Sequence, residues 1–162
     1  MMRPVLGGLA ALLMLGFAGG ASADDSAKPP MTQTPGQRVV QGSFVPTWLL
    51  KATLYHGRGG GAGSRDSLGC KPVAMRTVAV DPTLIPKRTI LFIAETVGLP
   101  LPGGGRHDGY WYASDTGGSI KGSRIDLFTG AGSGSMKPAM PLNLKKVTIA
   151  KAGKFDGCPP AK

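Results

Sequence analysis

Glycine and proline are spread so densely through this chain that no long helix fits between them. The 162 residues include 26 glycines and 14 prolines, and both residue types break helices and shape turns. No window carries a dozen-residue apolar stripe of helical period. Six short strand-like runs lie between these breaks: Trp48–Tyr55, Met75–Val80, Thr89–Glu95, Gly109–Ser114, Arg124–Phe128 and Lys146–Ile149. Six such runs predict an all-β fold with few short helices, a small closed or nearly closed barrel.

The N-terminus has the pattern of an exported protein. An arginine is followed by an apolar stretch and by the small-residue motif Ala-Ser-Ala, which predicts a secretory signal peptide over residues 1–23, cleaved after Ala23. The apolar stretch is too short and glycine-rich for a membrane span of about 20 residues, so no stable membrane anchor is expected. Residues 24–43 are polar and proline-rich and are predicted to form a flexible tether. The folded domain is then expected over residues 44–162, with a periplasmic or secreted location.

The chain is strongly basic, with a formal charge of +10. In a cytosolic protein this charge would suggest nucleic acid as the partner. Outside the cytoplasm, the anionic partners are the cell-wall polymer and membrane surfaces, and no nucleic acid is expected. The alternative is that the charge serves solubility alone. The protein is expected to be a monomer.

Cys70 and Cys158 are the two cysteines. An oxidising compartment permits them to pair, and a bridge would tie the C-terminal tail to the domain. By the loop-entropy model, closing so long a loop contributes about 4 kcal/mol. The alternative is two separate thiols. Neither cysteine has a second ligand at the spacing of a zinc site, so no metal site is expected.

Three aspartates occur in unusual contexts. Asp115 and Asp126 are eleven positions apart in D-T-G-G-S-I-K-G-S-R-I-D, and Asp126 lies inside the apolar run I-D-L-F. Asp81 follows the strand-like run T-V-A-V and precedes a proline. Taken singly, each has an ordinary explanation: a turn former, an Asx-turn or a surface residue of an edge strand. Aspartate is rare in strands and costly to bury, so together the three favour a site for acid catalysis.

The segments V-A-V-D-P-x-x-I-P, A-S-D-T-G-G-S-I-K-G and R-I-D-L-F resemble the three-aspartate, or 3D, domain. The preceding A-T-L-Y also resembles the opening strand of that domain, so the resemblance covers roughly residues 51–130. The 3D domain occurs in membrane-bound lytic transglycosylase A and in smaller exported proteins related to it. The resemblance implies a double-psi β-barrel. It also implies non-hydrolytic cleavage of peptidoglycan glycan strands to a 1,6-anhydromuramoyl end, without a cofactor.

Carried over by position, Asp126 matches the catalytic acid/base of the family, and Asp115 and Asp81 match the supporting aspartates. The chain has no room for the second domain of the large family members, so we expect a shallower glycan groove. Apolar neighbours and the Asp115 carboxylate are expected to raise the pKa of Asp126. One carboxyl suffices in this reaction because the muramoyl 6-hydroxyl is the nucleophile, whereas glycoside hydrolases use two carboxylates.

Six further residues are candidates for substrate binding. Lys121 and Arg124 are predicted to bind lactyl or peptide carboxylates, with a solvated basic turn as the alternative. Lys121 is expected to point away from Asp126, since its charge there would lower the pKa of the acid. The remaining candidates are aromatic residues on which sugar rings can pack and hydroxyl residues that can hydrogen-bond: Tyr55, Trp111, Thr53 and Thr116. Core packing and local capping are the alternatives, because strand alternation allows only some aromatics to face a groove.

Other functions fit the sequence less well. The single D-T-G segment is also an aspartic-protease motif, but such a protease would have to be a symmetric dimer, because it needs two such aspartates. His56 and His107 are far apart in sequence and do not support a metal role. The main competitor is a non-catalytic wall-binding or wall-loosening module that uses the basic surface and the aromatics for adhesion. An acid within an apolar run favours the enzyme over this binder.

Overall fold

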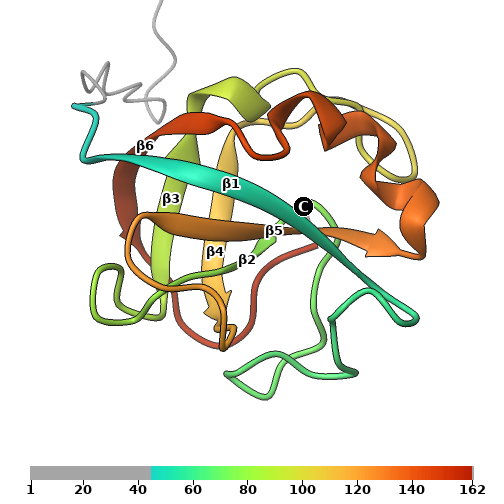
Figure 1. The fold of residues 1–162 in the computed structure, drawn as a ribbon, viewed down its shortest axis with the longest axis horizontal. Helices are drawn as coiled ribbons and strands as arrows, with labels where there is room; N and C mark the ends of the chain where they lie inside the picture. Colours follow the sequence, from blue (N-terminus) through green and yellow to red (C-terminus); the bar gives the residue numbers. More distant parts are fainter. Residues whose placement is uncertain (1–44, 162) are drawn as a thin grey trace, which may run out of the picture. The chain divides into compact units, whose positions relative to one another are not determined.

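A computed structural model of the protein describes residues 45–161. The predicted signal peptide, 1–23, and tether, 24–43, lie outside the described residues and remain predictions. Six strands form at the six runs expected from the sequence (Figure 1). Their bounds are β1 Trp48–Gly57, β2 Thr77–Ala79, β3 Thr89–Ile93, β4 Tyr110–Asp115, β5 Arg124–Ala131 and β6 Lys146–Lys154.

The strands close into a barrel in the order β1-β5-β2-β4-β3-β6. The pairs β1–β5 and β2–β4 are parallel, and the other four neighbouring pairs are antiparallel. Exchanging β1, β2 and β3 with β4, β5 and β6 reproduces the same neighbours with the same sense of pairing. The closed, mixed six-stranded barrel confirms the expected fold class, and this internal two-fold relation agrees with the double-psi topology that the resemblance implied.

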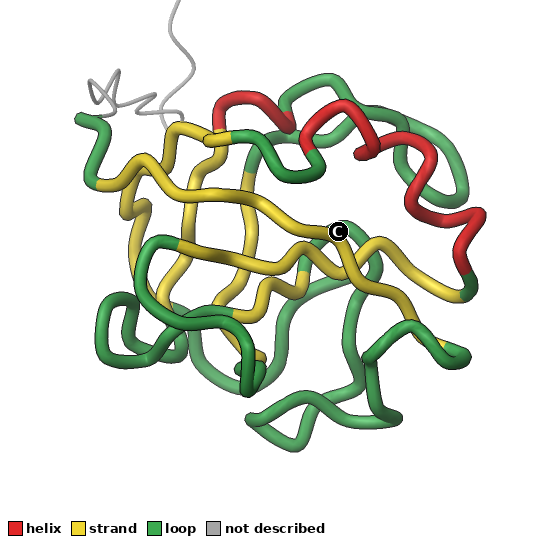
Figure 2. The backbone as a smooth tube through the Cα atoms, viewed as in Figure 1, coloured by secondary structure: helices red, strands yellow, loops and turns green. Residues whose placement is uncertain are grey.

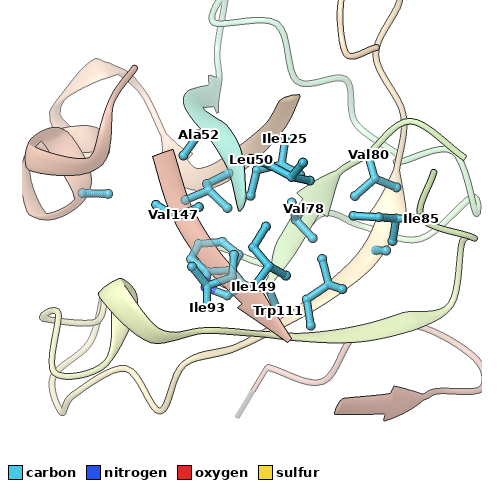
Figure 3. Close-up of a cluster of buried hydrophobic side chains, with 14 of the residues drawn as sticks. Leu50, Ala52, Val78, Val80, Ile85, Ile93, Trp111, Ile125, Val147 and Ile149 are labelled. Carbon is cyan, nitrogen blue, oxygen red and sulfur yellow. The ribbon is translucent and has the colours of Figure 1, made fainter. Parts of the chain in front are cut away.

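The interior of the barrel is filled by alternate residues of the strands (Figure 3). Ala52 of β1, Val78 of β2, Trp111 of β4 and Ile125 of β5 are completely buried, as is Ile149 of β6. Because side chains alternate across a strand, burial of these residues turns their immediate neighbours to the outer face of the barrel. Asp126 lies on this outer face, on β5, and the strand paired with it there is β1.

Two short 3-10 helices accompany the barrel, η1 Ala94–Thr96 and η2 Ser133–Leu142. The longer one packs against β1 and β5 (Figure 2). It contains Pro138 and Pro141, which lack the N–H groups that an α-helix interior needs. In the part of the chain that the structure describes, no helix is long and apolar enough to cross a membrane.

Cys70 and Cys158 are joined by a disulfide, with their Cα atoms 5.6 Å apart. The bridge connects the long segment between β1 and β2 to the tail that follows β6. A hydrogen bond from the Arg88 guanidinium to the Gly157 carbonyl, 2.9 Å, holds the same tail against the segment before β3. The C-terminal tail is therefore fixed to the barrel at two points.

Candidate active site

The parallel pairing of β1 and β5 places Asp126 directly opposite Thr53. The neighbours Ile125 and Leu127 are fully buried in the barrel core. Asp126 therefore projects from the outer face, where it is half-buried. The apolar neighbours that made Asp126 unusual in the sequence point into the barrel, and Asp126, between them on β5, points outward.

The surroundings of Asp126 favour the protonated form of its carboxyl group. Its Oδ1 is buried and, among the described residues, is one of two such side-chain atoms without a hydrogen-bond partner. Burial is the main cause of a raised pKa of this carboxyl, and the charge of Asp115 raises it further. The Thr53 hydroxyl and the charge of Arg124 act in the opposite direction and lower the pKa. The net shift is upward, as a general acid requires.

Asp115 lies beside Asp126, and both of its carboxylate oxygens accept hydrogen bonds. Ala79 of β2 is paired with Asp126 on one side and with Asp115 on the other, so the two aspartates flank one residue. The Tyr55 hydroxyl donates to Asp115 Oδ2 at 2.9 Å, and the backbone N–H of Thr116 donates to Oδ1 at 2.9 Å. These bonds fix the carboxylate in place, so that its charge acts steadily on its neighbour.

A loop that the sequence did not single out also holds Asp115. The backbone N–H of Ser67 donates to Asp115 Oδ1 at 3.0 Å, and the Ser67 hydroxyl donates to the Ser114 carbonyl at 3.0 Å. Asp66 orders this loop, since its Oδ1 accepts the N–H groups of Leu68 and Cys70 at 3.0 and 2.8 Å. The disulfide at Cys70 then ties the loop to the C-terminal tail.

Asp66 itself is nine-tenths buried, at 6 % exposure, and its Oδ2 is the other unpartnered buried atom. The charges of Asp66, Asp115 and Asp126 all act on the Tyr55 phenol, whose pKa is raised chiefly by burial. A fourth aspartate therefore lies near the pair at this site. In the sequence Asp66 lies four positions before Cys70 in no recognisable motif, so the sequence gave no signal that identified it.

Asp81, which follows β2, binds the loop between β4 and β5 through a hydrogen bond. Its Oδ2 accepts the backbone N–H of Gly122 at 2.8 Å, and its Oδ1 accepts the N–H and hydroxyl of Thr83 at 3.0 and 2.8 Å. The Gly122 hydrogen bond is the main cause of a pKa lowered to about 2. Asp81 is thus an ionised anchor for the loop between β4 and β5, and it carries no proton at neutral pH.

Lys121 and Arg124 lie together at the edge of the site. With Lys51, Ser119 and Ser123 they line a shallow pocket of about 260 Å³. The charge of Lys121 acts on Asp81, and that of Arg124 acts on Asp126. No ion pair of the described residues involves Asp126, and the direction in which Lys121 points stays a prediction. Lys51 is a pocket residue that the sequence did not reveal.

Trp111 was predicted to bind substrate, and this prediction is wrong. Its side chain is fully buried, stacks on His107 with ring centroids 4.9 Å apart, and donates from Nε1 to Thr96 Oγ1 at 3.0 Å. His107 is also buried, with its Nε2 2.7 Å from the Met75 carbonyl and its Nδ1 accepting the N–H of Gly109. Strand alternation placed Trp111 on the inner face of β4.

Tyr55 does not offer an open face to a sugar ring either. Its exposure is 7 %, and its ring packs against Phe128 at a centroid distance of 5.2 Å. It acts on the site through its hydroxyl instead. The Thr53 hydroxyl donates to the Ile125 carbonyl of the paired strand β5 at 3.1 Å. Thr116 contributes its backbone N–H to Asp115, and substrate binding by the two threonine hydroxyls stays a prediction.

A second cavity, of about 660 Å³, is lined by residues that include Arg76, Arg106 and Asp108 and the glycines 103–105. None of the three aspartates of the motif lines it. Its carboxylate, Asp108, is ion-paired with the buried Arg76 and has no free proton to donate. Within residues 45–161, no cluster of three histidine, cysteine or acidic residues is arranged to hold a metal ion.

Comparison with known proteins places this geometry in context. Residues 76–139, which include all three aspartates, match the family model of the 3D domain. This match confirms the resemblance seen in the sequence motifs. No curated protein sequence matches the chain.

Several solved structures are similar to this chain. The lytic transglycosylase LtgG of Burkholderia pseudomallei is 25% identical over 59% of this chain and 29% of its own, with a TM-score of 0.40. MltA of Neisseria gonorrhoeae is 24% identical over 60% and 23% of the two chains, with a TM-score of 0.40. Escherichia coli MltA with bound chitohexaose is 24% identical over 58% and 30%, with a TM-score of 0.38. This chain thus spans less than a third of the length of each of these proteins.

The arrangement as a whole suits acid chemistry with a single proton carrier. Asp126 has the raised pKa, Asp115 is a fixed neighbouring carboxylate, and Asp81 is an ionised loop anchor. Asp126 projects from the outer face of β5, where its side chain is half-buried.

Proposed function

We propose that this protein is an exported lytic transglycosylase that cleaves the glycosidic bond between the MurNAc and GlcNAc units of peptidoglycan. The observation that carries the proposal is the buried, unpartnered oxygen of Asp126, whose pKa is raised by burial beside Asp115. The match of residues 76–139 to the 3D domain supports the assignment of the substrate class. Export fits the disulfide, which forms in oxidising compartments.

The proposed reaction uses one carboxyl twice, first as an acid and then as a base. Asp126 donates its proton to the oxygen of the glycosidic bond, and the bond from that oxygen to the muramoyl C1 breaks. The muramoyl 6-hydroxyl then attacks C1 and closes the 1,6-anhydro ring. Its proton passes to the Asp126 carboxylate, which restores the acid. No water is consumed, so no second carboxylate is needed to activate one.

Arg124 and Asp115 act on this cycle with opposite signs. The charge of Arg124 favours the carboxylate of Asp126 once the proton has left, whereas the charge of Asp115 favours the protonated acid. Tyr55 holds Asp115 through its hydroxyl and is a positioning residue. Asp81 positions the loop that carries Lys121, through its bond to Gly122.

The decisive experiment analyses the products formed from purified sacculi in water enriched in oxygen-18. We expect soluble fragments that end in 1,6-anhydromuramoyl groups and contain no label, because the nucleophile is a hydroxyl of the substrate. Labelled reducing ends in the mass spectrum would identify a hydrolase and refute the proposed reaction.

A wall-binding module is the second candidate, because the cations Lys51, Lys121 and Arg124 share one pocket and have no ion-pair partner among residues 45–161. The same incubation distinguishes it from the enzyme. Protein that sediments with sacculi but releases no soluble sugar would establish the binder and exclude the transglycosylase.

A further inference from the structure

The outer face of β1 and β5 arranges its side chains in three successive rows across the two strands. The register pairs one residue of each strand in each row. The middle row contains the candidate acid and the threonine opposite it, and the third row is aromatic. The first row is basic, on the side of the acid away from the aromatic pair. In order, the rows are Lys51 with Arg124, Thr53 with Asp126, and Tyr55 with Phe128.

The basic row forms one wall of the 260 Å³ pocket described above. Lys121 and two serine residues from the β4–β5 loop complete it, and Lys146 of β6 is paired with Lys51 on the far side. Among the described residues, the ion pairs join Asp108 to Arg76 and His107, so none of the pocket cations has such a partner. Several cations around one hollow with no paired carboxylate produce a positive potential that attracts an anion.

The position of this pocket relative to Asp126 indicates which anion it would meet. Adjacent rows on one face of a strand are two residues apart, which corresponds to about 7 Å along the strand. In the proposed reaction, Asp126 protonates the oxygen on C1 of a muramoyl unit. The same sugar ring carries a lactyl ether on C3, and that ether ends in a carboxyl group or continues into the peptide stem. A muramoyl carboxylate is therefore within reach of the basic row when the scissile oxygen is at Asp126.

We propose that Lys51, Lys121 and Arg124 form a subsite for a carboxylate of the muramoyl unit, and that this subsite makes the protein prefer anionic muramoyl glycans over neutral ones. The proposal rests on the proposed function for the orientation of the sugar. Lysine and arginine bind carboxylates through charge-assisted hydrogen bonds, and the serine hydroxyls supply neutral donors. The carboxylate has two sources, the free lactyl group of a stripped glycan or the acidic residue of a peptide stem.

The test is a calorimetric binding titration of the full chain with three disaccharides of GlcNAc and MurNAc. The first carries a free lactyl carboxylate, the second a neutral lactyl methylamide, and the third a lactyl group linked to an L-Ala–D-Glu dipeptide. We expect at least one anionic ligand to bind about tenfold more tightly than the methylamide, the effect of one charge-assisted hydrogen bond. Tightest binding of the first ligand identifies the lactyl carboxylate, and tightest binding of the third identifies the stem.

Lys51→Gln should reduce this preference to about twofold or less, because it removes the cation opposite Arg124. Lys137→Gln is the matched control, since Lys137 is an exposed lysine of η2 outside the pocket; it should preserve the full preference. Equal affinity of all three ligands for the wild-type protein, or an unchanged preference in Lys51→Gln, would overturn the subsite.

Binding and cleavage are measured separately, so the two proposals can fail separately. Discrimination between the ligands without release of anhydro products from sacculi would refute the reaction and retain the subsite. Release of anhydro products without discrimination would refute the subsite alone.

Discussion

Replacing Asp126 by asparagine should lower activity by orders of magnitude without weakening the fold. Asparagine keeps the shape of the side chain but has no proton to transfer. General acid–base catalysis contributes about 10²- to 10⁴-fold to a rate, which corresponds to about 3 to 5 kcal/mol of activation free energy. We expect the rate of release of anhydro-muropeptides from sacculi to fall by that factor in Asp126→Asn.

The effect on stability should have the opposite sign. Burial raises the pKa of Asp126 in the folded state above its unfolded value, so ionisation is easier in the unfolded chain. Wild-type stability is therefore lost as pH rises from about 4, the ordinary aspartate pKa, towards the higher folded pKa. Asparagine does not ionise, so Asp126→Asn should equal the wild type near pH 4. At pH 7 it should be the more stable of the two, because the wild-type carboxyl has to ionise where it is buried.

Urea unfolding at pH 4 and pH 7 measures this difference, with sugar release measured on the same preparations. Asp156→Asn is the matched control, because it removes an exposed carboxylate outside the site and should change neither property. If Asp126→Asn were less stable than the wild type at pH 7, the carboxyl would be a structural partner and the argument for a poised acid would fail. Retention of wild-type activity would refute the catalytic role directly.

Three further substitutions test the parts around this acid. Asp81→Asn should lower stability clearly at pH 7 and much less at pH 2. The folded pKa of about 2 lies below the ordinary value of 3.8, so the stabilisation falls as pH drops below 3.8 and is lost as pH passes through 2. Equal unfolding midpoints at pH 7 would contradict the role of the hydrogen bond from Gly122. Replacing Cys70 and Cys158 together by serine should lower the free energy of unfolding by about 2 to 4 kcal/mol, and unchanged thermal unfolding would refute this. Tyr55→Phe should cost about 1 kcal/mol of stability and lower kcat more than it raises KM, whereas a change in KM alone would show that Tyr55 binds substrate.

The sequence was sufficient for the barrel because its strands are short, apolar and bounded by glycine or proline. It placed all six strands and gave the positions of Asp81, Asp115 and Asp126 through the motif. It could not show on which face of its strand Trp111 lies. Three aromatic residues follow one another there, so either Trp111 or its two neighbours could point inward. The fully buried Ala113, two positions further on, shares the inner face with Trp111, but the sequence cannot show that burial.

Contacts between distant segments were beyond the sequence. Ser67 holds Asp115 from 48 positions away, and Lys51 joins Arg124 only because β1 pairs in parallel with β5. Neither residue has a local pattern that marks it. The role of Asp81 also depends on such a contact, the hydrogen bond from Gly122. The sequence shows only an aspartate before a proline, which is equally typical of an ordinary turn residue.

The strand order has a consequence for how the chain acquires its structure. Only β3 and β4 are neighbours both in the barrel and along the chain, so hairpin-by-hairpin assembly is unavailable. The first strand must wait for both of its neighbours, β5 and β6, which are the last to be synthesised. Such non-local pairing slows folding. We therefore expect a growing chain of this topology to stay unfolded until its final strand has been synthesised.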